Sequence, residues 1–536
     1  MWPRNWREQL PEILAGDWDI VIIGGGITGA GILLEAARQG LRALLVEQRD
    51  FAWGTSSRSS KLVHGGLRYL KEGKLRLTRA SVRERQNLLR EAAGLVEPQS
   101  FAFADYRGRK PGRWLFSVGL ALYDWMAGQR SRRYYPEDEF LLLAPHIARA
   151  GLKGGMCYSD AKTDDARLVL RVLQEALAAG GVAVNYLAVT QVLRAEGKPT
   201  GVKLLDALNG ANYTVKARVV INATGAWADD FRQNTAAGRK LRPLRGSHLL
   251  LPAWRLPVAQ AVSLMHPRDG RPVFAFPWEG VTLVGTTDVD HSESMKAEAT
   301  ITPDEVAYLM QALEFQFPEL GLGLDDIIAT FAGVRPVIDS GKADPSKEAR
   351  DHAVWLEQGL LTVTGGKLTT FRLIASDALA HCAPLLPGAH APLRPAPTFP
   401  PLEPLPAGSA LTPAQVQRLQ GRYGRHAADL LAAAHRGELE TIAGSETLWA
   451  ELRWAARAEA VAHLEDLLLR RTRLGLQLRQ GGAELLPRVR AICQAELGWD
   501  DRRWLAEEAA YLELWRRCYS LPPRTSIPDW HASAPS

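Results

Sequence analysis

The chain has 536 residues, of which 46% are hydrophobic and 23% are charged. This composition excludes disordered and fibrous proteins, and the length allows several domains. The 65 Lys and Arg against 59 Asp and Glu leave a net charge of +6, a mild excess that is compatible with anionic ligands or lipid and requires neither. The cysteines form no C-x-x-C pair, which argues against a disulfide scaffold, a Cys-rich zinc site and an iron–sulfur cluster and favours a reducing compartment; they are Cys157, Cys382, Cys493 and Cys518.

The N-terminal segment MWPRNWREQL lacks the continuous apolar core of a secretion signal. Its Trp2, Arg4, Trp6 and Arg7 are residue types found where a chain touches a membrane surface. A structural cap or a disordered lead-in is the alternative. Further along, the longest apolar run (residues 114–127) is too short to cross a bilayer and contains an aspartate.

A glycine-rich pattern in residues 18–47 indicates a nucleotide cofactor. An apolar strand runs into GGGITGAG, a helical pattern follows, and a second apolar strand ends at Glu47. We expect Gly24 to allow a tight turn, Gly26 to let the backbone approach a pyrophosphate, and Gly29 to let helix and strand pack closely. The N–H groups at the helix start would bind phosphate, and Glu47 would accept hydrogen bonds from the adenosine ribose, which argues against NADP.

Two later segments favour FAD over NAD. The first, VVINATGAWAD (219–229), is a buried strand ending in small residues, where a second strand would pass the dinucleotide. The second, LTVTGGKLTTFR (361–372), is a strand, a double glycine and a helix start. That helix N-terminus would stabilise negative charge at N1–C2=O of a reduced flavin. Taken singly, each segment is also compatible with an ordinary turn in a parallel sheet.

Proline and hydrophobic periodicity divide the chain. Ten of the 32 prolines lie between residues 384 and 413, so this stretch predicts an extended linker, and helical spacing follows it. Strands alternate with helices upstream, which predicts an α/β fold with a parallel sheet and an inserted second sheet. The expected units are a Rossmann-like FAD-binding domain over 17–75, 150–235 and 330–385, an inserted α+β substrate (cap) domain over 76–149 and 236–329, a Pro-rich linker over 386–411, and an all-α C-terminal domain over 412–520.

A set of motifs along the chain carries a family resemblance. They are TSSRSSKLVHGGLRYL from Thr55, DDARLVL from Asp164, NATGAWAD from Asn222, RGSHLLLP from Arg245, GTTDVD from Gly285, AGVRPV from Ala332, GGKLTTFR from Gly365 and RRTRLG from Arg470. With them the chain resembles the FAD-dependent glycerol-3-phosphate dehydrogenases of the D-amino-acid-oxidase-like group. The string SSKLVHGGLRYL is specific to that family.

The resemblance implies noncovalent FAD and the oxidation of sn-glycerol 3-phosphate to dihydroxyacetone phosphate, by hydride transfer from C2 to flavin N5. It implies a membrane quinone as the electron acceptor. It also implies a cytoplasmic enzyme attached peripherally to the inner face of the cell membrane, and it is compatible with a homodimer.

The resemblance also assigns roles to individual residues. A dianionic substrate needs fixed cations, and guanidinium groups match phosphate oxygens in bidentate fashion. For the proton of the C2 hydroxyl, His248 is the first candidate base and His64 the second, while Arg335 would instead stabilise the alkoxide. Lys367 would lie by the flavin or the developing oxyanion. The implied substrate positions are Arg68, Tyr69, His248, Arg335 and Arg350; the implied cofactor positions are Gly24, Gly26, Gly29, Glu47, Thr55, Ser56, Ser57, Ser59, Ser60, Ala223, Gly225, Gly366, Lys367, Leu368 and Thr369.

Three positions depart from the family pattern: Thr28, Phe371, and Arg58, which places a charge between two serine pairs. Two alternative functions stay open at this point. One is a glycerol-3-phosphate oxidase that uses O₂ and makes H₂O₂. The other is a tRNA-modifying flavoprotein, which the balance of acids and bases in the helical tail opposes, so no nucleic-acid partner is expected. The tail itself would be an interaction module or a helical cap on the core.

Overall fold

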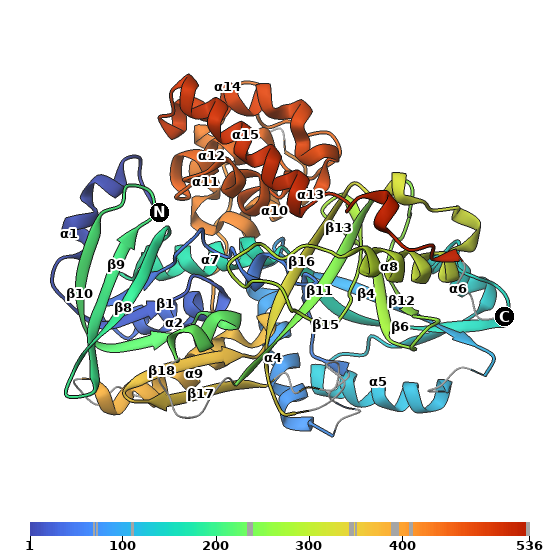
Figure 1. Cartoon of the computed structure of the whole chain (residues 1–536). Coiled ribbons are helices and arrows are strands. Elements are labelled where there is room, and N and C mark those ends of the chain that lie inside the picture. Colours follow the sequence, from blue (N-terminus) through green and yellow to red (C-terminus); the bar gives the residue numbers. More distant parts are fainter. Residues whose placement is uncertain are drawn as a thin grey trace.

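The structure is a computed structural model of the chain. Two β-sheets lie next to each other, and the C-terminal helices lie across both (Figure 1). This arrangement is the predicted α/β fold with an inserted second sheet and an all-α tail. The structure describes residues 1–67, 70, 73–108, 112–232, 240–341, 348, 351–386, 396–406 and 411–531.

The first sheet is parallel at its centre, in the strand order β17–β18–β10–β1–β2–β7. Ile20 and Ile22 of β1 pack against helices α2, α7 and α9, whereas Val21 and Ile23 pack against the other face, with β8, β9 and α1. Because both faces are covered, the central strands are apolar throughout. The elements are α1 (Leu10–Leu14), β1 (Asp17–Ile23), α2 (Ile27–Arg38), β2 (Ala43–Val46), α7 (Asp165–Ala178), β7 (Val182–Val184), β8 (Leu187–Ala195), β9 (Lys198–Asp206), β10 (Asn212–Asn222), β17 (His352–Glu357), β18 (Leu360–Gly365) and α9 (Phe371–Cys382).

The second sheet is largely antiparallel, in the order β15–β11–β14–β13–β12–β4–β6–β3, with β16 paired to β11 and β5 to β6. Helix α8 packs against one face of it, and part of the C-terminal domain packs against the other. The elements are β3 (Leu62–Val63), α4 (Leu75–Glu91), β4 (Val96–Tyr106), α5 (Arg113–Ala127), β5 (Arg133–Pro136), α6 (Glu137–Leu143), β6 (Leu152–Thr163), β11 (Leu241–Pro252), β12 (Ala261–Met265), β13 (Pro272–Trp278), β14 (Val281–Gly285), β15 (Val289–Asp290), α8 (Pro303–Gln316) and β16 (Ala329–Ile338).

Strand pairing divides the chain differently from the segments expected from sequence. β3, β6 and β16 fall in segments assigned to the FAD-binding domain, yet all three belong to the second sheet. The assignment was wrong for these strands because pairing partners are set by long-range contacts that the strand pattern does not contain. β16 thereby brings its residues beside β11, which becomes important for the site.

The first helix after the linker begins at the cap and proline that the sequence contains at Thr412 and Pro413. Thr412 caps α10 by accepting a hydrogen bond from Gln415 N (3.3 Å), and Pro413 occupies the first turn. Residues 396–406 of the preceding linker contain no helix or strand. The helices are α10 (Pro413–Tyr423), α11 (Ala427–Ala433), α12 (Trp449–Ala458), the π-helix η10 (Asp466–Arg471), α13 (Leu474–Gln477), α14 (Leu486–Leu497) and α15 (Asp501–Cys518).

The N-terminal segment is a structural cap. Trp2 is buried, lies against Phe51 with ring centroids 5.1 Å apart, and donates from Nε1 to Ala183 O (2.8 Å). Arg7 pairs with the buried Asp206 (2.9 Å). The membrane-contact interpretation of Trp2 and Arg7 is therefore wrong, because these side chains are already used to hold the segment on the first sheet.

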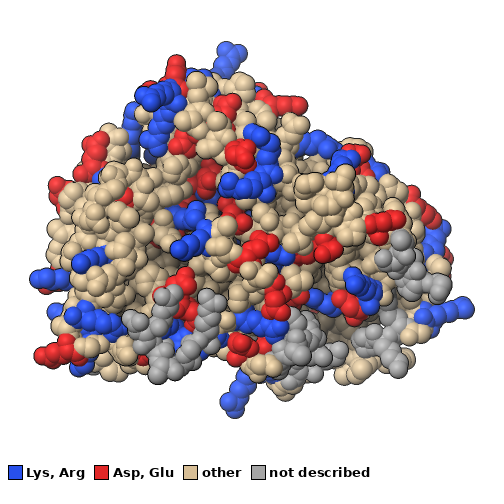
Figure 2. Space-filling view, in the orientation of Figure 1, with Lys and Arg blue, Asp and Glu red and all other residues tan. Residues whose placement is uncertain are grey.

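On the face shown in Figure 2, basic and acidic side chains are interspersed among the coloured residues and do not separate into patches of one sign. Of the helices in the described residues, none combines the length and apolar character needed to cross a bilayer.

Candidate functional site

The glycine loop between β1 and α2 is packed too tightly to admit side chains. Gly24 has a positive φ of 114°, and a Cβ there would lie 2.6 Å from Ala223 O at the end of β10. A Cβ on Gly29 would overlap the carbonyl oxygen of Gly24. Gly24 N donates to Val46 O (2.8 Å), so the loop is held between the ends of β2 and β10. The start of α2 thus opens at the carboxyl edge of the parallel sheet, where nucleotides bind in such folds.

Glu47 lies at the mouth of this loop. Its Oε2 accepts a hydrogen bond from Gly25 N (2.7 Å) and its Oε1 accepts one from Arg49 N (2.9 Å). Burial raises the pKa of this carboxyl, which the two backbone donors partly counteract. A tight glycine turn, a helix N-terminus and an acid at the end of the next strand together fit an adenine dinucleotide, with Gly24, Gly26 and Glu47 holding it.

A second element, the serine loop (residues 55–60), connects this helix start to the second sheet. Ser56 Oγ accepts from Ile27 N (3.0 Å) in the first turn of α2. Thr55 Oγ1 donates to Val334 O (2.6 Å) on β16. Ser60 Oγ is 2.9 Å from His248 Nε2 on β11. The loop therefore places hydroxyl groups between the phosphate-binding turn and the candidate base.

His248 is the best-defined candidate base. It is fully buried, and its ring is stacked on Phe331 with centroids 4.5 Å apart and planes 14° apart. Burial, together with the positive charges of Arg335 and Lys61, lowers the pKa of His248 well below its usual value. The imidazole is therefore neutral at pH 7 and able to accept a proton.

Arg335 lies four residues after Phe331, on the same face of β16. Its Nη1 is 2.9 Å from Asp288 Oδ1 and its Nη2 is 3.0 Å from Thr286 Oγ1. The Arg335 side chain is 20% exposed, and a Cβ on Gly246 would overlap its guanidinium. Asp288 and Thr286 fix the direction of Arg335, and its remaining exposure leaves it able to meet an anion.

The double-glycine turn after β18 approaches the same place from the first sheet. Gly366 has a φ of 75° and leads into Lys367, which caps the short helix η7 (Leu368–Thr370). Lys367 Nζ donates to Ser81 Oγ on α4 (3.1 Å). Thr369 Oγ1 donates to His64 O (3.2 Å), so the turn is tied to the loop that carries the second candidate base.

The remaining predicted residues fall into two groups. The turn after β10 carries Ala223 and Gly225, and Gly225 O accepts from Thr364 Oγ1 (2.9 Å), which links it to β18. Arg68, Tyr69 and Arg350, assigned to the substrate by resemblance, lie outside the described residues.

A fully buried cluster beneath the serine loop was not predicted. Asp165, the first residue of α7, accepts from Ser59 N (3.0 Å), Ser59 Oγ (2.7 Å) and Lys61 Nζ (2.9 Å). Arg473 of the C-terminal domain donates from Nη2 to Ser57 O (2.7 Å) and to Asp165 Oδ1 (3.2 Å). Burial and the neighbouring Arg473 lower the pKa of Lys61 to about 8. The C-terminal domain thus contacts the backbone of the serine loop directly.

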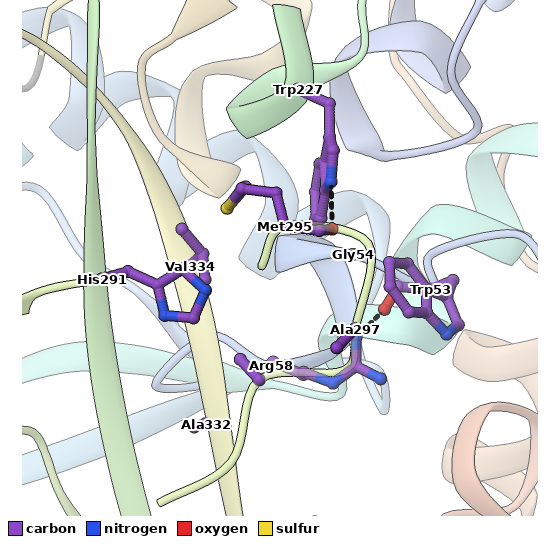
Figure 3. A pocket seen from close by; sticks show the side chains of 10 residues that line it. Trp53, Gly54, Arg58, Trp227, His291, Met295, Ala297, Ala332 and Val334 are labelled. Carbon is purple, nitrogen blue, oxygen red and sulfur yellow. Dashed lines mark hydrogen bonds between the residues drawn. The ribbon is translucent and has the colours of Figure 1, made fainter. Parts of the chain in front are cut away.

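Beside the serine loop lies a hollow of about 270 Å³, including its open mouth, with Trp53 and Trp227 on its walls (Figure 3). Trp227 Nε1 donates to Met295 O (2.7 Å). Arg58, the charge that departs from the family pattern, is buried there and pairs with Glu298, which Tyr519 of the C-terminal domain also contacts. Its charge is therefore compensated.

Among the residues that the structure describes, no group of three or more His, Cys, Asp or Glu side chains is arranged to hold a metal ion.

Comparisons with known proteins agree with this geometry. A family model described as FAD dependent oxidoreductase matches residues 19–372, and one described as the C-terminal domain of alpha-glycerophosphate oxidase matches residues 384–504. The aerobic glycerol-3-phosphate dehydrogenase of Staphylococcus aureus (strain USA300) is 39% identical over 379 residues, which cover 69% of this chain and 68% of that protein.

Solved structures show the same fold. A glycerol-3-phosphate dehydrogenase from Bacillus halodurans complexed with FAD superposes with a TM-score of 0.74 at 27% identity, covering 96% of this chain and 98% of that one. L-alpha-glycerophosphate oxidase from Mycoplasma pneumoniae with FAD bound gives 0.56 at 18% identity, covering 73% of this chain and 100% of that one, and supports the fold alone. The chain belongs to the FAD-dependent oxidoreductase family, among the glycerol-3-phosphate dehydrogenases, and its cofactor is FAD.

Proposed function

We propose that this protein oxidises sn-glycerol 3-phosphate to dihydroxyacetone phosphate and passes the electrons to a membrane quinone. The observation that carries the first half is the placement of a neutral, buried His248 and a partly accessible Arg335 on paired strands beside the serine loop. A base and a fixed cation at one place match a substrate that combines a secondary alcohol with a phosphate.

The cofactor, Arg335 and His248 have separate roles in the reaction. FAD, when bound, supplies the hydride acceptor. Arg335, aimed by Asp288 and Thr286, binds substrate oxygens, and His248 takes the hydroxyl proton at Nε2, the nitrogen that faces Ser60. Burial lowers the proton affinity of His248, and Arg335 and Lys61 lower it further, so a bound phosphate dianion would offset the part that these two cations contribute. Base strength would thus rise when substrate arrives.

The quinone half of the proposal is supported by the surface of α5. Trp114 and Trp125 are 77% and 72% exposed, and Leu115, Val118 and Leu122 are exposed on the same helix. An exposed apolar patch of this kind marks a contact with a partner or a membrane. Exposed basic residues stand at both ends of the helix, Arg113 at its first position and Arg130 and Arg133 after its last, as is typical of a helix lying on anionic lipid.

We therefore propose peripheral attachment to the inner face of the cell membrane through α5. A homodimer stays a prediction.

The alternative electron acceptor is O₂, because the family model that matches the C-terminal tail is named after an oxidase. Anaerobic mixing with glycerol 3-phosphate should bleach the flavin absorbance, whereas glycerol, lactate and D-alanine should not. If one of these three compounds bleaches the flavin and glycerol 3-phosphate does not, the substrate proposal is wrong. Rapid H₂O₂ production in air without added quinone would instead favour the oxidase.

A matched pair of variants tests the proposed base. His248→Asn should slow flavin reduction by glycerol 3-phosphate about 10²- to 10⁴-fold, the usual contribution of a general base. His266→Asn is the control, since His266 is a buried histidine stacked on Tyr308 and bonded to its carbonyl oxygen (2.8 Å), away from the serine loop. Equal rates in both variants would remove His248 from the mechanism.

A further inference from the structure

The C-terminal domain holds a segment of chain that borders the cofactor site. Residues 50–58 run past the glycine loop into the serine loop, and we call them the 50–58 segment. Ala52 N donates to Gly25 O (3.0 Å), and Ser56 Oγ accepts from Ile27 N (3.0 Å). The segment is therefore in contact with both the glycine turn and the helix start at which the adenine dinucleotide fits.

Buried contacts tie both ends of this segment to the C-terminal domain. Asp50 Oδ2 accepts hydrogen bonds from Arg470 Nε and Arg471 Nη1, each at 2.6 Å. At the other end, Arg58 Nη2 donates to the hydroxyl oxygen of Tyr519 (3.1 Å). All five side chains are buried, and these partners are 420, 421 and 461 residues apart in sequence. The path of the segment therefore depends on the docked domain and not only on its own sequence.

Arg473 makes the central contact, at the serine loop itself. The carbonyl oxygen of Ser57 accepts from Arg473 Nη2 (2.7 Å) and from Lys61 Nζ (2.9 Å). Both cations are fully buried, so these are charge-assisted hydrogen bonds that water does not compete for. Arg473 Nη1 donates to Leu469 O (2.9 Å), and the Arg473 backbone has a positive φ of 66°, which a residue other than glycine keeps only where its surroundings hold it. The C-terminal domain thus aims this guanidinium at the serine loop.

We propose that Arg473 is a positioning residue for the cofactor: through Ser57 O it holds the serine loop in the shape that binds FAD, so that docking of the C-terminal domain and binding of FAD are coupled. A ligand that needs one arrangement of a loop stabilises every contact that holds this arrangement, and such coupling is reciprocal. FAD should therefore strengthen the docking of the domain, and loss of the Arg473 contact should speed the release of FAD. Because only the cofactor enters this coupling, its test is independent of the substrate and of the electron acceptor.

The release of FAD from Arg473→Met holoenzyme is the first test. The variant leaves no carboxylate of this cluster without a cation, because Asp165 keeps Lys61 (2.9 Å) and Asp164 keeps Arg422 (2.9 Å). After dilution, free FAD is separated from the protein by ultrafiltration at intervals and measured by its absorbance. Release should be faster than in the wild type by about tenfold or more, within the usual range of coupling between two linked sites. An unchanged rate would overturn the proposal.

Arg453→Met is the matched control. Arg453 is also a buried arginine of the C-terminal domain, but it pairs with Glu438 (2.6 Å) and Glu496 (2.7 Å), which both belong to that domain. Its loss should lower the stability of the protein in urea and leave the rate of FAD release at the wild-type value. Equally fast release from both variants would mean that lost stability alone frees the cofactor, and the proposal would be wrong.

Hydrogen exchange on the wild-type full chain tests the reciprocal effect and needs no variant. When FAD is removed, amide exchange should become faster in residues 466–473, which carry the three arginines that hold the 50–58 segment. Exchange in α14, which packs against α12 and α15 inside the C-terminal domain, should stay the same. Readdition of FAD should restore the slow exchange. No change in residues 466–473, or the same change in α14, would overturn the coupling.

Discussion

The interface of the C-terminal domain and the surface of α5 differ in which groups they bury and which they leave exposed to water. At the interface, charged side chains are removed from water: Arg167 and Glu459 form a two-fold hydrogen-bonded pair (2.6 and 2.9 Å) in which both are fully buried. On α5, hydrocarbon is left in water, with two tryptophans mostly exposed.

The difference shows what each surface is for. Charges taken from water are costly unless every group is paired, and this interface pairs them, so its stability depends on complete contact between two domains. The apolar face of α5 gains nothing from the fold it belongs to, which is why we assign it to a partner outside the chain. Substitutions should therefore act on folding at the first surface and on attachment at the second.

The largest effect is expected from Arg167→Met. It leaves the Glu459 carboxylate buried with only Gln174 Nε2 (3.2 Å) as a remaining side-chain donor, and should lower the free energy of unfolding by about 3–5 kcal/mol. Urea titration followed by circular dichroism measures it.

The control for this variant is Arg425→Met. Arg425 pairs with Glu175 at 3.0 Å but is 48% exposed, so its loss should cost no more than about 1 kcal/mol. The double variant Arg167→Met/Glu459→Met should recover most of the loss, because no charge is then left unpaired. Equal losses in the single and double variants would show that packing, not charge, holds the interface.

Acid should act on the interface next. Burial alone would raise the pKa of Asp164, but Arg473 and Arg422 lower it to about 2. Because the folded-state pKa lies below the unfolded value, this stabilisation is complete above pH 4 and is lost as the pH falls from about 4 to 2, by roughly 2 kcal/mol.

Unfolding free energies measured between pH 5 and 2 check this. Asp164→Asn keeps a side chain that can cap α7 and should flatten the slope over that interval. A slope that is the same in both proteins would contradict the assignment.

The smallest effect on folding is expected at α5. Trp114→Ser/Trp125→Ser should change stability by no more than about 0.5 kcal/mol, because both rings are exposed. The same variant should bind vesicles containing anionic lipid at least tenfold more weakly at low salt, in a flotation assay. Trp254→Ser is the matched control, since Trp254 is 76% exposed and lies far from α5 in the sequence. Equal loss in both variants would remove α5 as the attachment surface.

The features of the fold and site that the sequence predicts are those that depend on local chemistry. The glycine loop and the cap at Thr412 follow from spacing alone, because a turn needs positive φ or a hydroxyl at a fixed offset. The two sheets and the helical tail follow from periodicity and proline content. The family motifs single out His248 and Arg335, which the fold places on adjacent strands.

Long-range contacts explain the remainder. Asp165 and Arg473 are 308 residues apart in sequence, and the resemblance included their motifs without giving them a role. The available signal was fixed charge inside otherwise apolar helical segments, which requires a buried partner. The burial of Trp2 likewise depends on Phe51 and Ala183, whose proximity only the folded chain creates.

The pairing of Asp50 with Arg471 has a consequence for synthesis. The two are 421 residues apart, and Arg471, with Arg470, is what lowers the pKa of Asp50 to about 2 despite its burial. At about 5–20 residues per second, a ribosome needs roughly 20 to 80 s to travel from one to the other. During that time the strands of the first sheet are completed, up to β18, while the Asp50 carboxylate still lacks its guanidinium partners. A chain interrupted before residue 470 would keep that defect permanently and be the form that proteases remove.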